Sequence, residues 1–163
     1  MPIPLTSDQR AALESGVVAV RTLVDFHLDS GRYSFWDGEF NTDFGGQTYI
    51  AASDFGEISA ITMGMDLGAE GVEIRLNGTK LLEENPDIGD PGALFGTLES
   101  ENYQLRRVDI RFAFLEPETG ALILLVRRYA GLIDQVRQVE EIGADGAIRS
   151  LLIVSLESVA RRY

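Results

Sequence analysis

Apolar residues alternate with polar ones in stretch after stretch of this 163-residue chain, and this period of two limits the possible fold most. Between residues 18 and 28, the even positions are Val, Val, Thr, Val, Phe and Leu, whereas the odd positions include Arg21, Asp25 and His27. This pattern predicts a half-buried β-strand. Comparable patterns predict further strands at residues 33–36, 47–50, 57–63, 71–76, 107–115, 121–133, 136–142 and 148–156.

Turn-forming residues separate these predicted strands. Glycine, proline, asparagine and aspartate favour the backbone conformations that reverse a chain. They cluster at residues 29–32, 37–38, 45–46, 77–78, 117–120 and 144–146. Many short strands at this spacing, without βαβ alternation, predict a mainly β protein built as an antiparallel β-sandwich or barrel.

Two short helices are expected beside the strands. Thr6 or Ser7 can cap a helix that stops at Gly16, since a hydroxyl accepts from the first free backbone amides and glycine ends helices readily. Asp90-Pro91-Gly92 predicts a second helix over 91–100, embedded between the strands. We therefore expect an N-terminal arm and helix over 1–16, followed by a single β-sandwich or barrel domain over 17–163.

The net charge of −12 is distributed unevenly along the chain. Residues 1–100 carry seventeen acids and five bases, whereas residues 101–163 carry nine of each. An excess of acids opposes both specific nucleic-acid binding, which needs clustered cations, and electrostatic attachment to anionic lipid. No apolar stretch is long enough for a transmembrane helix, and the N-terminus lacks a basic segment followed by an apolar run, so we expect synthesis in a cytoplasm.

Few residues offer catalytic chemistry. The absence of cysteine excludes disulfides, thiolate metal sites and cysteine nucleophiles, and His27 is the single histidine. No serine lies in a nucleophile elbow, and no glycine-rich phosphate loop occurs. Asp25 and His27 lie two apart on one strand face, a spacing at which a carboxylate can orient an imidazole. We expect His27 to be an ordinary surface residue, and we predict that the protein is not an enzyme.

Two acidic clusters are candidate ion or hydrolase sites. Oxygen side chains occupy every second position in the first cluster, at Asp37, Glu39, Asn41 and Asp43, as in a calcium loop. The closing bidentate glutamate and the helix–loop–helix frame are missing. The second cluster consists of Glu83, Glu84, Asp87 and Asp90. We interpret both clusters as solvated acidic loops, and we assign no catalytic, cofactor-binding or metal-binding residue and no cofactor.

Arginine pairs and one aromatic group are candidate docking surfaces. The pairs are Arg106/Arg107, Arg127/Arg128 and Arg161/Arg162, which we expect at or near strand ends. Guanidinium groups bind carboxylates in a bidentate manner, so copies of an acidic and arginine-paired chain can dock head to tail. Ordinary surface arginines explain the spacing equally well. Tyr33, Trp36 and Tyr49 leave open an alternative function, a carbohydrate-binding β-sandwich module with an aromatic stacking platform.

Most of the chain after residue 18 resembles a family of tail baseplate-hub proteins of siphophages and phage-like gene transfer agents. The order of all the matching segments, rather than any one motif, carries this resemblance. These segments are Leu23-Val24-Asp25-Phe26, Tyr33-Ser34-Phe35-Trp36-Asp37-Gly38, Gly46-Gln47-Thr48-Tyr49, Phe55-Gly56-Glu57-Ile58-Ser59, Gly71-Val72-Glu73-Ile74-Arg75-Leu76-Asn77-Gly78, Tyr103-Gln104-Leu105-Arg106-Arg107-Val108-Asp109-Ile110, Phe114-Leu115-Glu116 and Glu157-Ser158-Val159-Ala160-Arg161-Arg162-Tyr163.

The resemblance implies a virion protein without catalytic residues, related in fold to tail-tube and distal-tail proteins. Such a protein forms a ring at the tail tip that joins the tail tube or distal-tail ring to the central hub or fibre. DNA passes through this ring without specific binding, and no membrane insertion is involved. Many relatives continue past the Arg161-Arg162-Tyr163 segment into a second domain. Two tube-like domains per chain suit a trimer and one suits a hexamer, so both copy numbers stay open.

Overall fold

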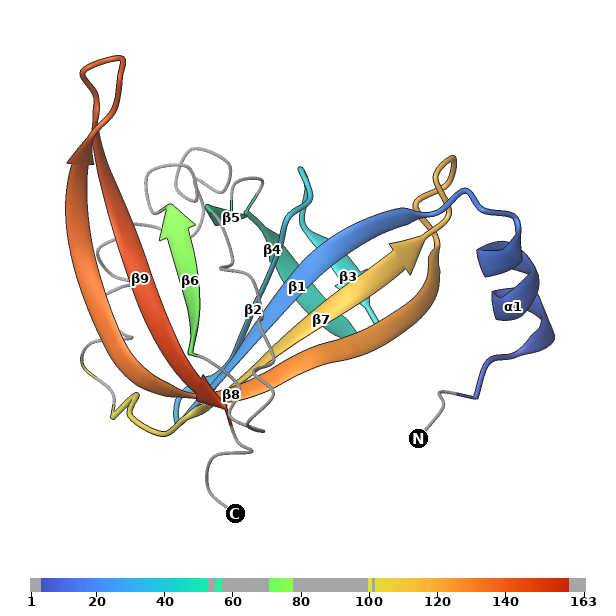
Figure 1. The fold of residues 1–163 in the computed structure, drawn as a ribbon, viewed down its shortest axis with the longest axis horizontal. Helices are drawn as coiled ribbons and strands as arrows, with labels where there is room; N and C mark the ends of the chain where they lie inside the picture. Colours follow the sequence, from blue (N-terminus) through green and yellow to red (C-terminus); the bar gives the residue numbers. More distant parts are fainter. Residues whose placement is uncertain (1–3, 53–54, 57–70, 78–99, 101, 159–163) are drawn as a thin grey trace.

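The computed structural model describes residues 4–52, 55–56, 71–77, 100 and 102–158, and this part of the chain is mainly β. Its strands join in one nine-stranded sheet of order β3-β4-β2-β1-β7-β8-β9-β6-β5 (Figure 1). The elements are α1 (Ser7–Glu14), β1 (Ala19–Leu28), β2 (Gly31–Trp36), β3 (Thr42–Phe44), β4 (Gln47–Ala51), β5 (Phe55–Gly56), β6 (Val72–Asn77), β7 (Arg107–Leu115), β8 (Leu122–Ile142) and β9 (Ile148–Ser158).

The predicted mainly β class is confirmed, and the structure refines its architecture. The sheet is open, so the sandwich-like form of the prediction holds and the closed barrel does not. Among the described residues, every ladder is antiparallel except β2–β4, where Phe35 pairs with Ile50 and Trp36 with Ala51 in parallel. Strand β3, which lies within the expected acidic loop, reverses the chain between β2 and β4 and so makes this parallel pairing possible.

Strand β8 connects the two halves of the sheet. Its residues 122–132 pair with β7, and its residues 131–142 pair with β9 (Figure 1). The sequence predicted two strands here, 121–133 and 136–142, but they form one strand with a register shift between Ile133 and Gln135. Gly131 lies where the pairing partner changes, and a Cβ atom there would come within 2.9 Å of the Glu157 carbonyl oxygen. The close approach of β9 therefore requires glycine at this position.

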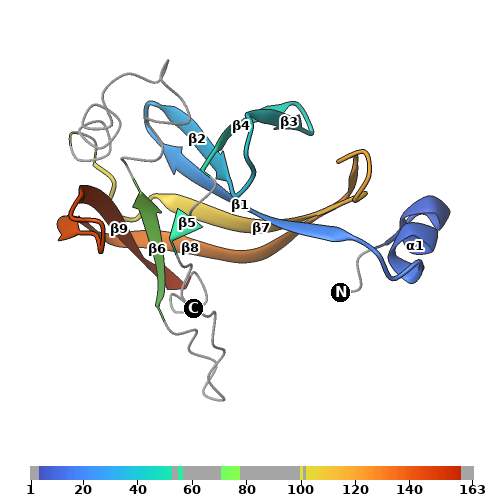
Figure 2. The ribbon, with the colours of Figure 1, turned by 90° about the horizontal axis from the view of Figure 1, so that it is seen from above.

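The main core lies between the two halves of the curved sheet. Strand β8 curves, so β6 and β9 face β1, β2 and β7 across apolar side chains (Figure 2). Even-numbered residues of β1, such as Val24 and Phe26, point into this core, as the alternation predicted. Its buried members are Val24, Phe26, Leu28, Phe35, Ala52, Val72, Ile74, Leu76, Val108, Ile110, Tyr129, Ile133, Leu152, Val154 and Leu156.

A second, smaller core lies on the other face of β1 and β7. There the β3–β4 hairpin places Phe44 and Tyr49 over Leu23, together with Ala113 and Leu115 of β7. The odd-numbered face of β1 is therefore covered at this end, although its sequence is partly polar.

The predicted N-terminal helix is confirmed as α1, whose Thr6 N-cap accepts a hydrogen bond from the Gln9 amide. None of its residues is buried, and Gln9 Nε2 donates to the Ile123 carbonyl oxygen of β8 at 2.9 Å. The predicted strand over 57–63 lies outside the described residues, as does the predicted helix over 91–100 apart from its last residue. Among the described residues, no helix is long and apolar enough to span a membrane.

Candidate functional site

Two buried carboxylates face each other on neighbouring strands of the central sheet. The β1–β7 ladder pairs Asp25 with Asp109, and these residues are 0% and 1% exposed. Both lie on the odd-numbered face of their strands, opposite to the main core. Two neighbouring buried charges of the same sign are unfavourable unless cations compensate for them, so their partners define the site.

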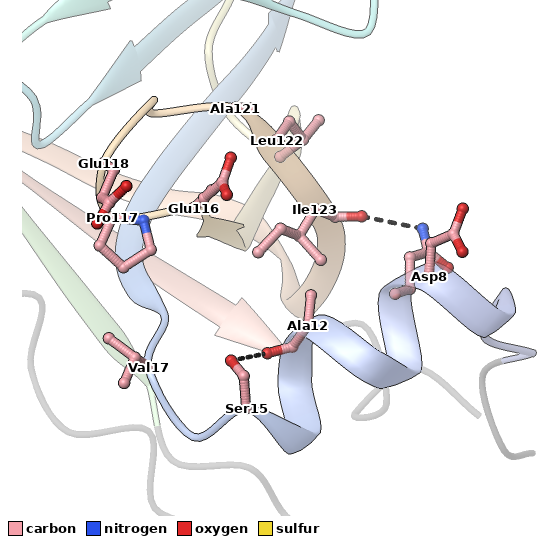
Figure 3. A pocket seen from close by; sticks show the side chains of 11 residues that line it. Asp8, Ala12, Ser15, Val17, Glu116, Pro117, Glu118, Ala121, Leu122 and Ile123 are labelled. Carbon is pink, nitrogen blue, oxygen red and sulfur yellow. Dashed lines mark hydrogen bonds between the residues drawn. The ribbon is translucent and has the colours of Figure 1, made fainter.

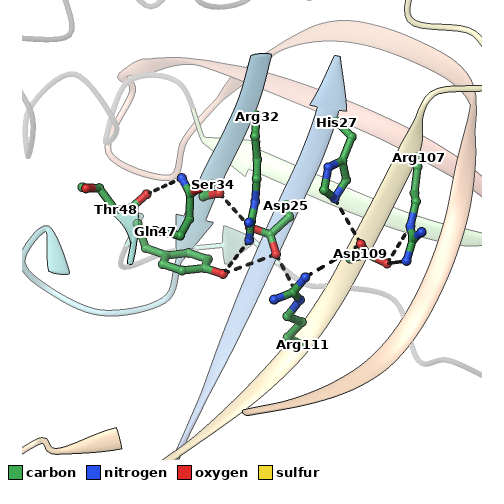
Figure 4. Close-up of polar contacts among 10 residues, drawn as sticks. Asp25, His27, Arg32, Ser34, Gln47, Thr48, Arg107, Asp109 and Arg111 are labelled. Carbon is green, nitrogen blue, oxygen red and sulfur yellow. Dashed lines mark hydrogen bonds and ion pairs between the residues drawn. The ribbon is translucent and has the colours of Figure 1, made fainter. Parts of the chain in front are cut away.

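Asp25 is held mainly by Arg32 of the neighbouring strand β2 (Figure 4). Arg32 donates from Nε at 3.1 Å and from Nη2 at 2.7 Å to Asp25 Oδ1, and Ser34 Oγ donates to the same oxygen at 2.7 Å. Tyr49 OH lies 3.4 Å from Asp25 Oδ2 and accepts from Arg32 Nη2 at 3.0 Å. The β3–β4 hairpin thus closes the polar cluster through the Tyr49 hydroxyl.

Asp109 is held by groups on both sides of it (Figure 4). Arg107 donates to Oδ1 from Nε at 3.1 Å and from Nη2 at 2.9 Å. His27 Nε2 lies 3.1 Å from Oδ2. Arg111 connects the two carboxylates, with Nε 3.2 Å from Asp25 Oδ2 and Nη2 4.0 Å from Asp109 Oδ2. We call these two aspartates, with Arg32, Ser34, Tyr49, Arg107, Arg111 and His27, the carboxylate cluster.

The structure corrects the predicted environment of His27 and Asp25. The imidazole contacts Asp109 across the ladder rather than Asp25 on its own strand. His27 is 36% exposed, whereas Asp25 is fully buried. Because apolar and polar residues alternate along β1, the sequence pattern predicted that both residues lie on a solvated polar face. It did not indicate that β3 and β4 would cover that face.

Arginines compensate both carboxylates of the cluster, although Arg111 Nε is buried without a hydrogen-bond partner among the described residues. Burial acts to lower the pKa of Arg32, but the hydrogen bond and the charge of Asp25 outweigh it, so this pKa lies above its ordinary value. Burial, and after it the charge of Asp25, raises the pKa of Tyr49. Both shifts favour the protonated form, the cation of Arg32 and the neutral hydroxyl of Tyr49, and both forms suit an ionic network around Asp25. With both carboxylates buried and bonded, the cluster is arranged for strand register rather than for attack on a substrate.

The candidate calcium residues do not converge. Asn41 Oδ1 accepts from the Ala51 amide at 2.8 Å, and Asp43 Oδ1 accepts from Thr48 Oγ1 at 2.6 Å. Asp37 Oδ1 is buried without a hydrogen-bond partner in the described structure, and burial raises the pKa of this carboxyl. Among the described residues, no three His, Asp or Glu side chains are grouped as metal ligands. The acidic cluster at 83–90 lies outside those residues.

The three candidate platform aromatics do not share a surface. Tyr49 is fully buried, and Trp36 packs edge-on against Phe44, with ring centroids 5.4 Å apart. Tyr33 lies on the opposite face of β2, against the main core. The carbohydrate-platform hypothesis therefore loses the single flat surface that it requires.

The arginine pairs have different environments. Arg106 forms an ion pair with Asp29, and Arg107 belongs to the carboxylate cluster, at the predicted start of β7. Arg127 and Arg128 lie within β8 rather than at a strand end, because β8 continues through the predicted boundary. Both are exposed. Arg161 and Arg162 lie outside the described residues.

A hollow of about 800 Å³ lies between α1 and the β7–β8 turn (Figure 3). Its walls combine apolar side chains, including Val17 and Leu122, with the carboxylates of Asp8, Glu116 and Glu118. The described residues that line it include no histidine, cysteine, lysine or arginine, so they do not supply a nucleophile with a neighbouring base.

The fold has a counterpart among solved structures. The chain is similar to one chain of the structure described as "Virion of native gene transfer agent (GTA) particle", with a TM-score of 0.57 and 15% sequence identity. The similarity covers 95% of this chain and 45% of that one, so this chain spans less than half the length of its counterpart. No family model and no curated protein matches the sequence. At this identity, the comparison establishes a shared fold.

Proposed function

We propose that the protein is a structural component of a phage-like or gene-transfer-agent virion, at the tail tip. In this proposal it is a baseplate-hub component whose copies form a ring. The ring joins the tail tube or distal-tail ring to the central hub or fibre. The observation that carries the proposal is the shared fold over 95% of the chain with a chain of a gene transfer agent virion.

The arrangement of the sheet supports an assembly role. Residues 122–130 of β8 pair only with β7, and residues 134–142 pair only with β9, within the described structure. Apart from the Ile123 carbonyl oxygen, which accepts from Gln9 Nε2 of α1, each half of β8 therefore has one edge whose backbone groups are open to another strand. Open edges of this kind readily pair with a second chain.

The charge distribution supports a channel for DNA. In the proposed ring, the acidic segments 37–43 and 83–90 line the channel. Because like charges repel and no counterions are released on contact, DNA slides past such a surface without binding. A ring with these segments on its outside contradicts this part of the proposal.

The copy number follows from how many tube-like domains each subunit supplies. This chain spans 45% of its structural counterpart. A subunit with one such domain suits a hexamer, and a subunit with two suits a trimer. The expected neighbours are a distal-tail or tail-tube protein on one side and a central hub or fibre protein on the other.

Immunogold labelling of the virions tests the location. Antibodies raised against residues 4–158 should label one end of the tail, and tails from a deletion strain should lack both label and tip. Label along the whole tail, on the capsid or on no particle contradicts the tail-tip assignment.

A further inference from the structure

Strand β8 carries unpaired charges of opposite sign towards its two ends. Arg127 and Arg128 are exposed in its first half, and Glu140 and Glu141 are exposed in its second half. Within the described residues, none of the four side chains forms an ion pair or a hydrogen bond. The strand therefore carries an arginine pair and a glutamate pair of opposite charge that do not form ion pairs with each other.

These groups cannot meet within one molecule. Thirteen residues separate Arg127 from Glu140, which corresponds to about 40 Å along a strand. The ladders with β7 and β9 fix both halves of β8, so the strand cannot fold back on itself. A second copy of the chain carries both groups and can bring them together.

Arg127 also has an unfavourable neighbour inside the sheet. The β7–β8 ladder places Arg127 directly opposite Arg111, and like charges in this position repel. Arg111 is engaged with the carboxylate cluster, whereas Arg127 forms no ion pair with an acid of the described residues. An external carboxylate would relieve this repulsion.

Apolar residues accompany both charges at the same spacing. Ile142 follows Glu140 by two residues and is 78% exposed, and its cross-strand partner Ile148 is 67% exposed. At the other end, Leu125 precedes Arg127 by two residues and is half-buried against the smaller core. Leu125 and Arg127 share a hollow of about 410 Å³ with Val126 and Arg111. Side chains two apart point to one face of a strand, so each end presents one charge beside one apolar group.

We propose that the β8–β9 hairpin tip, residues 139–149, docks on the Leu125–Arg128 surface of a second copy. In antiparallel register, Glu140 meets Arg127 and Ile142 meets Leu125. The two surfaces differ, so the contact is head to tail and repeats around a closed ring. This inference rests on the proposed ring and names the contact that closes it.

Charge reversal tests the contact. The full chain and its variants Glu140→Arg, Arg127→Glu and Glu140→Arg/Arg127→Glu are compared by sedimentation velocity and native mass spectrometry over a concentration series at low salt. Each single reversal places like charges in contact, so the apparent dissociation constant of the assembly should rise at least about tenfold. The double reversal should recover most of the lost affinity, because it restores an opposite-charge pair.

Glu118→Arg is the matched control, since it makes the same charge change at an exposed residue of the β7–β8 turn, outside both docking surfaces and both proposed channel segments, and should leave assembly unchanged. All variants should keep the circular-dichroism spectrum of the parent and should melt at no lower temperature, because the altered side chains are exposed and Arg127→Glu replaces the repulsion from Arg111 by an attraction. Equal assembly of the parent and the single reversals, or no recovery in the double reversal, overturns the contact.

The outcomes separate this contact from the proposed function. If tail tips are labelled but the parent assembles independently of these charges, the contact is wrong and the location stands. A parent protein that stays monomeric over the whole series also refutes the contact. If label is additionally absent from tail tips, both proposals fail.

Discussion

The two faces of the β1–β7 pair bury different kinds of side chain. One face buries Val24, Phe26 and Ile110 in an apolar core. The other buries Asp25 and Asp109 among arginines, a histidine, a serine and a tyrosine. The same two strands thus separate an apolar core from the buried carboxylate cluster.

This difference separates what stabilises the fold from what specifies it. Apolar burial contributes to stability without regard to direction. A buried ion pair recovers little more than its desolvation cost, but its hydrogen bonds are satisfied only in one arrangement. A one-residue slip of the β1–β7 register would move Asp25 into the main core, so the ionic face penalises incorrect pairing.

The largest effect is expected on the apolar face. Phe26→Ala removes a fully buried ring that packs edge-on against Phe35 at a centroid distance of 6.1 Å. We expect a loss of about 3–5 kcal/mol in the free energy of unfolding, measured by urea denaturation. Val20→Ala, at a residue of β1 that is 47% exposed, is the control and should cost under about 1 kcal/mol. Equal losses would contradict the assignment of the main core.

On the ionic face, Asp25→Ala should cost about 3 kcal/mol, because it leaves Arg32 and Arg111 without their shared carboxylate. Asp134→Ala removes an exposed carboxylate from β8 and should change stability by under about 0.5 kcal/mol. The comparison is made by chemical denaturation of both variants. A loss below about 1 kcal/mol for Asp25→Ala would mean that the cluster is dispensable.

The join between the two sheet halves should respond less strongly. Gly131→Ala brings a methyl group within 2.9 Å of the Glu157 carbonyl oxygen, so β8 and β9 must move apart. We expect a destabilisation of about 1–3 kcal/mol, with the melting temperature as the measurement. Gly120→Ala, where a Cβ meets no atom within 4 Å but φ is +69°, separates backbone strain from this crowding. If both substitutions lower the melting temperature equally, the close approach of β9 to Gly131 does not explain the need for glycine there.

The smallest effect concerns Asp37. Burial of its carboxyl group raises its pKa above the ordinary value of 3.8. In this case the folded state holds its proton to higher pH than the unfolded state, so stability falls as pH rises through the two pKa values. Asp37→Asn should therefore stabilise the protein at pH 7, by no more than about 1 kcal/mol because the group is only half-buried. The advantage should disappear below the ordinary pKa. A variant that is less stable at pH 7 would contradict this sign.

The apolar half of the fold was predictable from sequence, and the ionic half was not. Alternation along residues 18–28 and 107–115 predicted β1 and β7 and most of the buried side chains of their apolar face. It also placed Val20, Phe112 and Phe114 on that face, and these three are not among the buried members of the main core. The same alternation made Asp25 and Asp109 look solvated. Their burial depends on the β3–β4 hairpin, and the short β3 gave no strand pattern within an acidic stretch.

The pairing of strands distant in sequence was also hidden. The sequence predicted a strand at 71–76 but not that β6 would pair with β9, about eighty residues later. The sequence also predicted two strands in place of β8, with the boundary at Asp134. A β-bulge there interrupts the alternation of apolar and polar residues in the same way as a turn does. The contact of His27 with Asp109 required the β1–β7 register, which neither strand encodes alone.

Cryo-electron microscopy of the native virion tests the central claim most directly. The account predicts a closed ring at the tail tip that contains three or six copies of this nine-stranded sheet. In each copy, residues 37–43 face the DNA channel and the 139–149 hairpin tip contacts the neighbouring copy. A tail tip without this fold, or single copies that do not touch one another, would contradict it.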